Sequence, residues 1–149
     1  MASDDLPSTV WVGRRPIYRW LAAFTASCFV GTLATDLAYW RTADMMWADF
    51  SAWLLTVGVI VGCVTVVVAL IETFAVRSPL RGRLTWPYAL GFLVALILAT
   101  LDMFVHTRDA WTSVVPLGLL LSAATVLVLI LTGWMMRESY GTADTEVIA

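Results

Sequence analysis

The stretch from Gly91 to Trp111, GFLVALILATLDMFVHTRDAW, begins as an apolar helix and ends in a group of ionisable side chains. That group contains Asp102, His106, Arg108 and Asp109, and His106 is the only histidine in the chain. A helix needs about 20 largely apolar residues to cross a bilayer core of about 30 Å. With its flanking residues the stretch reaches this length, so it predicts a membrane-spanning helix with a polar end.

Three further runs without charged residues have the same character: 20–35, 50–71 and 110–136. The 149 residues are 60% hydrophobic and 13% charged, with a mean hydropathy of +0.85. Soluble domains are about half apolar and about a quarter charged. We therefore predict an all-α, polytopic membrane four-helix bundle with helices at about 17–40, 46–76, 84–107 and 111–137. The predicted domains are a single transmembrane domain at 10–140 and disordered tails at 1–9 and 141–149.

The arginines predict the orientation of the chain in the membrane. One side of the predicted bundle holds Arg14, Arg15, Arg19, Arg77, Arg81, Arg83 and Arg137, and the other side holds only Arg41 and Arg108. Short cytoplasmic loops carry the excess of basic residues. We expect a multi-pass protein of the bacterial inner membrane with both termini in the cytoplasm and the lipid bilayer as its main partner. The net charge of −2 and the scattered basic residues argue against a nucleic-acid partner.

Small residues spaced by three or four indicate where the helices pack, because they let helix backbones approach closely in lipid. The stripe in the third helix continues into Asp102 and His106, so these two polar groups should face into the bundle. The predicted packing positions are Gly58, Gly62, Gly91, Ala95, Ala99, Gly118 and Ser122. The glycine faces also leave a homo-oligomer, or a place in a larger membrane complex, as open alternatives.

An outer polar cluster is predicted where the first and third helices end. Its candidate members are Asp36, Arg41, Asp102, His106, Arg108 and Asp109. Acidic groups and an imidazole facing inward near the membrane must be paired, hydrated or functional. We favour a structural lock in which Asp36 or Asp102 pairs with Arg41 or Arg108. Two alternatives stay open: a proton- or cation-binding vestibule, and a divalent metal bound by His106 with Asp36 and Asp102.

A second polar group is predicted at the inner side of the bundle. Glu72 lies at the level of Arg14, Arg15, Arg19 and Arg77, which favours an ion pair between the first and second helices. A proton-relay role for Glu72 is the weaker alternative, because no chain of carboxylates joins it to Asp102.

No cofactor is expected from the sequence. Bis-histidine ligation of haem needs two histidines, and the chain has one. No Ser-His-Asp, P-loop, GxGxxG or CxxC arrangement is present. The prediction therefore leans towards a non-enzymatic structural or accessory subunit. The alternative is a small ion- or proton-transport or metal-binding protein that uses the outer cluster.

Several motifs resemble a bacterial family of membrane proteins grouped as domain of unknown function 2231. They are Thr35-Asp-Leu-Ala-Tyr-Trp40, Met46-Trp-Ala-Asp-Phe-Ser-Ala-Trp-Leu-Leu55, Trp86-Pro-Tyr-Ala-Leu-Gly91, His106-Thr-Arg-Asp-Ala-Trp111 and Thr132-Gly-Trp134. The resemblance covers residues 15–141, approximately. It implies a small inner-membrane four-helix domain with no established activity.

The chain departs from the family pattern at several positions. Family members often carry a His-Pro element before the first helix and a histidine early in the third. This chain has Arg15-Pro16 and Tyr18 at the first place and Tyr88 at the second. Phe92 stands where a polar Asn is expected, and Asp102 where Asn is common. The resemblance thus implies that a ligand site on the cytoplasmic side of relatives is lost here, whereas the outer cluster has gained an acid.

Overall fold

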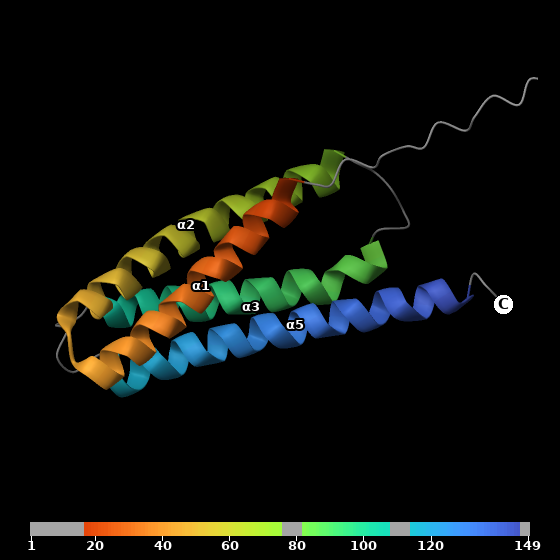
Figure 1. Ribbon diagram of the computed structural model, residues 1–149. Coiled ribbons are helices and arrows are strands. Elements are labelled where there is room, and N and C mark those ends of the chain that lie inside the picture. Colours follow the sequence, from red (N-terminus) through yellow and green to blue (C-terminus); the bar gives the residue numbers. More distant parts are fainter. Residues whose placement is uncertain (1–16, 76–81, 108–113, 147–149) are drawn as a thin grey trace, which may run out of the picture.

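Four long helices form the structure, a computed structural model that describes residues 17–75, 82–107 and 114–146. They are α1 (Ile17–Thr42), α2 (Met45–Ala75), α3 (Gly82–His106) and α5 (Leu119–Glu146), and a short irregular segment, η1 (Val114–Gly118), precedes α5. Figure 1 shows the helices running along one another as a bundle. Each is long and apolar enough to cross a membrane. The predicted all-α membrane four-helix bundle is confirmed.

The helices surround a common centre in the order α1, α2, α3, α5. The neighbouring pairs are α1–α2, α2–α3, α3–α5 and α5–α1, so α1 and α3 face each other across a diagonal. The short turn between α1 and α2 lies at the same end of the bundle as the last residues of α3 and the first residues of α5 (Figure 1). We call this the turn end of the bundle.

The turn between α1 and α2 is closed by local hydrogen bonds. Ala43 adopts a positive φ of 54°, and its N–H donates to the Tyr39 carbonyl at 2.8 Å. A left-handed residue of this kind commonly ends a helix. The Met46 N–H donates to Asp44 Oδ1 at 3.0 Å, so Asp44 caps the start of α2. These bonds make α1 and α2 an antiparallel hairpin.

The fourth helix differs from the predicted range 111–137 at both ends. Val115 has extended angles (φ −122°, ψ 123°), and regular α-helix begins at Leu119. The reason is Pro116, because the residue before a proline is pushed out of the helical region. At its other end, α5 continues to Glu146, past the predicted start of a tail at Gly141. No proline lies there, and a single glycine costs a helix only about 1 kcal/mol.

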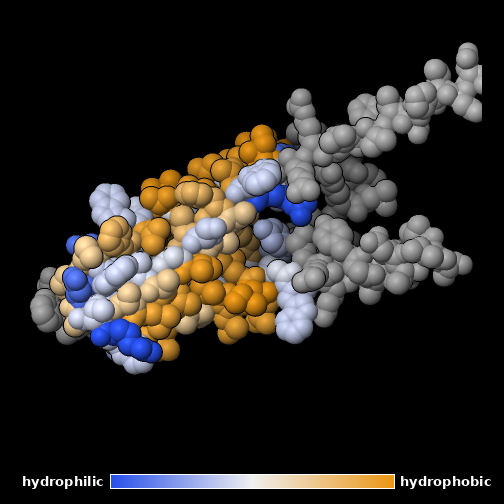
Figure 2. Space-filling view, viewed as in Figure 1, coloured by the Kyte–Doolittle hydropathy of each residue, from blue (hydrophilic) through white to orange (hydrophobic). Residues whose placement is uncertain are grey.

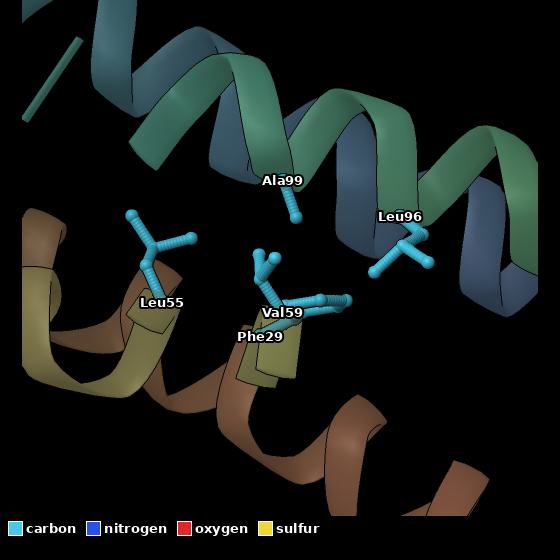
Figure 3. Close-up of a cluster of buried hydrophobic side chains, with 5 residues drawn as sticks. All are labelled: Phe29, Leu55, Val59, Leu96 and Ala99. Carbon is cyan, nitrogen blue, oxygen red and sulfur yellow. The ribbon is translucent and has the colours of Figure 1, made fainter. Parts of the chain in front are cut away.

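An apolar layer fills the centre of the bundle. Figure 3 shows the side chains of Phe29, Leu55, Val59, Leu96 and Ala99 converging from α1, α2 and α3. The outward faces are also largely apolar, and Figure 2 shows hydrophobic residues over much of the surface between hydrophilic groups at the turn end and near the opposite end. A chain with apolar side chains both inside and outside matches a lipid environment.

Glycines bring the helices into close contact. A Cβ atom added at Gly58 would lie 2.7 Å from Phe29 Cε1 and 3.0 Å from Cys28 Cβ, both on α1. A Cβ atom at Gly91 would overlap the side chain of Thr132 on α5. Gly133, in contrast, has no neighbouring atom within 4 Å of such a position. The lack of space therefore requires glycine at positions 58 and 91, but not at position 133.

We expect Gly58→Ala to destabilise the bundle. The added methyl group meets Cys28 Cβ, which the backbone of α1 holds in place, and Phe29, which is 2% exposed. Overpacking of this kind costs about 1–3 kcal/mol. Thermal unfolding of the purified protein in detergent, followed by circular dichroism, should show a lower midpoint for Gly58→Ala than for the wild type.

Gly133→Ala is the matched control. It makes the same chemical change within a helix, but in open space. Its midpoint should equal or exceed that of the wild type, because alanine favours helix more than glycine does. Equal midpoints for the two variants would contradict the assignment of Gly58 as a close-packing position.

Candidate functional site

Asp36, Asp102 and His106 meet inside the bundle at the turn end. His106 Nε2 lies 3.2 Å from Asp36 Oδ1, and His106 Nδ1 lies 3.2 Å from Asp102 Oδ1. The two aspartates are completely buried, and the imidazole side chain is 2% exposed. We call these three residues the Asp-His-Asp cluster. Burial of this degree separates the cluster from water.

The cluster joins two helices that are not neighbours. Asp36 belongs to α1, whereas Asp102 and His106 belong to the last turns of α3. Because α1 and α3 lie on a diagonal, the imidazole spans the interior of the bundle to reach Asp36. Asp102 and His106 are four residues apart and share one face of α3. The cluster therefore ties together opposite sides of the bundle.

The α1–α2 hairpin supplies two hydroxyl groups to the cluster. Ser51, completely buried on α2, donates a hydrogen bond to Asp36 Oδ1 at 2.5 Å. Thr35 Oγ1 lies 2.6 Å from Ser51 Oγ. The Thr35 hydroxyl also donates to the Gly31 and Thr32 carbonyls of its own helix, at 3.0 Å and 2.9 Å. Asp36 Oδ1 thus has hydrogen-bond partners on both α2 and α3.

The Asp102 carboxyl has a different environment. His106 Nδ1 lies 3.1 Å from the Asp102 backbone carbonyl oxygen, with which it forms its hydrogen bond, and 3.2 Å from Asp102 Oδ1. Among the described residues, neither carboxyl oxygen of Asp102 has a hydrogen-bond partner, and the same holds for Asp36 Oδ2. Gly118 of η1 closes this side: a Cβ atom there would lie 3.0 Å from His106 Cε1 and 3.4 Å from Asp102 Oδ1.

Arg41 does not join the cluster. Its guanidinium lies 5.7 Å from the ring centroid of Trp40, and its side chain is exposed. Arg41 follows Asp36 by five residues, which places it about 140° away around the helix. The predicted pairing of an aspartate with Arg41 is replaced by pairing with His106. Arg108 and Asp109, the other predicted members, lie outside the described residues.

Two members of the predicted inner ion pair, Glu72 and Arg19, lie in the described helices α2 and α1. Glu72 is half-buried on α2 and Arg19 is exposed on α1, and no ion pair joins the two in the part of the chain that the structure describes. Arginine near a helix end reaches towards the membrane surface instead. The other candidate partners, Arg14, Arg15 and Arg77, lie outside the described residues, so that pairing stays a prediction.

The predicted packing positions fall on inward faces. The buried ones are Gly58, Gly62, Ala95, Ala99, Gly118 and Ser122, and Gly91 is half-buried. Sequence reasoning did not find Ser51 or Thr35. The signal for Ser51 was its position seven residues before Gly58, which puts the two within about 20° on one helix face.

The geometry does not suit a metal ion. The described residues contain no group of three or more His, Cys, Asp or Glu side chains placed to hold one. Each ring nitrogen of His106 faces a different aspartate, so the imidazole separates the carboxyl groups. A metal site needs its ligand atoms to converge on one point. In the described structure the side chains of residues 36, 102 and 106 therefore do not converge on one point.

The four apolar helices and the buried cluster define a polytopic membrane protein with a polar group sealed in its interior. The chain belongs to the family described as "Predicted membrane protein (DUF2231)", which matches residues 14–139. This match confirms the resemblance seen in the sequence motifs. No curated protein and no solved structure matches the chain.

We expect Ser51→Ala to weaken the bundle at the turn end. The change removes a buried hydrogen bond to Asp36 and leaves that carboxylate with a single donor from another helix. Loss of a partner for a buried polar group costs about 1–3 kcal/mol, or more when the group is charged. The thermal midpoint in detergent should fall accordingly.

Ser27→Ala serves as the control for this change. The Ser27 hydroxyl is exposed and donates only to the Ala23 carbonyl of its own helix, at 2.9 Å. Its removal should leave the midpoint within error of the wild type. Similar losses in both variants would show that the hydroxyl of Ser51 contributes no interhelical stability.

Proposed function

We propose that the chain is a non-enzymatic structural or accessory protein of the bacterial inner membrane, in which the Asp-His-Asp cluster acts as an interhelical lock. The observation that carries this proposal is the burial of the cluster. Asp36 and Asp102 are inaccessible to water, and the His106 side chain is 2% exposed. A catalytic group or a transport vestibule must be reached by its substrate, and this cluster is closed.

The surroundings of the cluster support a lock. Directly below it, one helical turn towards the centre, lie Leu55 and Ala99 of the apolar layer. The side chains of this layer carry no polar group, and the buried hydroxyls of Thr32 and Ser122 nearby donate to carbonyls of their own helices. The cluster receives contributions from α1, α2 and α3, and η1 packs over it through Gly118. Such a position suits a group that fixes the relative placement of helices.

A flux assay tests the proposal against a transport function. We expect purified wild-type protein in liposomes to conduct protons, Na⁺ and K⁺ no faster than protein-free liposomes, because the closed cluster and the apolar layer block a path. A pH-sensitive dye inside the liposomes, with valinomycin to set the membrane potential, measures the proton flux. A channel-forming peptide provides the positive control.

Proton or cation flux through the wild type above that of protein-free liposomes would refute the lock and favour the transport alternative. Whether the partner is a second copy of the chain or another membrane protein is a separate question. Chemical crosslinking in native membranes, followed by mass spectrometry of the purified tagged chain, decides between the two partners.

We propose further that both termini face the cytoplasm. The basis is the arginine distribution, seven on one side of the bundle and two on the other. It follows that the Asp-His-Asp cluster lies towards the periplasm. A fluorescent protein fused after Ala149 should fluoresce, whereas alkaline phosphatase at the same place should be inactive. An active phosphatase fusion would reverse the orientation.

A further inference from the structure

The three ionisable groups of the Asp-His-Asp cluster cannot all be charged. One imidazolium and two carboxylates would leave a net negative charge in a fully buried site. A buried charge without an opposite charge is so unfavourable that such a group takes up a proton instead. Within the described residues no other cation reaches the cluster: α2 contributes the hydroxyl of Ser51, η1 contributes Gly118, and Arg41 lies over Trp40.

The hydrogen bonds show where the first proton lies. His106 Nδ1 faces the Asp102 backbone carbonyl at 3.1 Å. A carbonyl oxygen only accepts, so Nδ1 carries a hydrogen. His106 Nε2 lies 3.2 Å from Asp36 Oδ1, which is a hydrogen-bond distance, so we place one proton between these two atoms. The Asp36–His106 pair is therefore neutral as a whole, as a carboxylate beside an imidazolium.

Asp36 is the carboxyl group better suited to a negative charge. Its Oδ1 accepts from Ser51 at 2.5 Å and from His106 at 3.2 Å. Donors directed at a carboxylate favour its charged form. Asp102 Oδ1 has Nδ1 of His106 3.2 Å away, but that nitrogen forms its hydrogen bond with the backbone carbonyl, and neither carboxyl oxygen has a hydrogen-bond partner among the described residues. The remaining proton therefore belongs on Asp102.

We propose that Asp102 is a proton-binding site: a neutral carboxylic acid held, at neutral pH, beside the Asp36–His106 ion pair. This inference rests on the proposed lock, because it requires the cluster to be closed. It adds that the cluster binds a proton. The bound proton makes the whole cluster neutral. Asp102 Oδ1 is 3.2 Å from His106 Nδ1, so the neutral acid directly contacts the ion pair.

Infrared spectroscopy of the protein in lipid nanodiscs tests this assignment. A neutral carboxylic acid has a C=O stretching band that a carboxylate lacks, and the band shifts in D₂O. We expect wild-type protein at pH 7 to show this band and Asp102→Asn to lose it. Asp49→Asn, which changes an exposed carboxyl group on α2, should keep it. Glu72→Gln should also keep it.

Absence of the band in the wild type at pH 7 would overturn the proposal, and this outcome does not depend on the folding of any variant. Persistence of the band in Asp102→Asn, or its loss in Glu72→Gln, would overturn it as well. Flux in the liposome assay would refute the lock without changing the band, so the two proposals fail separately.

Thermal unfolding gives a second, independent measure. Asn has nearly the shape of a neutral aspartic acid, so Asp102→Asn should unfold within a few degrees of the wild type. Asp36→Asn removes the counter-charge of His106 and should unfold at a clearly lower temperature. The reverse order would place the charge on Asp102 and the proton on Asp36, contrary to the proposal.

Discussion

The structure depends on the pairing of buried carboxyl groups with the single histidine of the chain. Asp36 and Asp102 lie in the interior of an apolar bundle, where an unpaired charge is severely penalised. His106 is placed between them and contacts both. Because its two ring nitrogens point in different directions, one side chain reaches across the diagonal from α3 to α1 and also bonds to its own helix. Pairing of this kind fixes the depth and rotation of two helices that otherwise share little direct contact.

Small residues make this pairing geometrically accessible. Gly58 and Gly91 allow α2 to approach α1 and α3 to approach α5. Gly118 lets η1 close over the imidazole, where a side chain would collide with it. Close packing and polar pairing are therefore coupled, because the hydrogen-bond distances of the cluster require the helix separations that the glycines set. In lipid, where no water is expelled when helices associate, both effects are needed for a defined bundle.

Much of the fold could be predicted from the sequence, because long charge-free runs have one stable form in a bilayer. The phase of the small residues on the third helix also predicted that Asp102 and His106 face inward, and the structure brings both to Asp36. The partners of the aspartates were not predictable in this way. Arg41 has the right charge and is near in sequence, but its angle around α1 directs it to Trp40. Ser51 and Thr35 carry no charge and resemble any other hydroxyl of a membrane helix. The late start of α5 depended on the local effect of Pro116 on Val115.

The separation of Asp36 and His106 along the chain has a consequence for biogenesis. The two residues are 70 positions apart, so α1 and α2 emerge from the ribosome before the histidine has been made. During that interval the partner that its own hairpin offers to the Asp36 carboxyl is the hydroxyl of Ser51. Until α3 is made, the α1–α2 hairpin therefore lacks the side chain that pairs with Asp36 in the folded bundle. The cluster is completed when α3 inserts, because His106, the last residue of that helix, then pairs with Asp36.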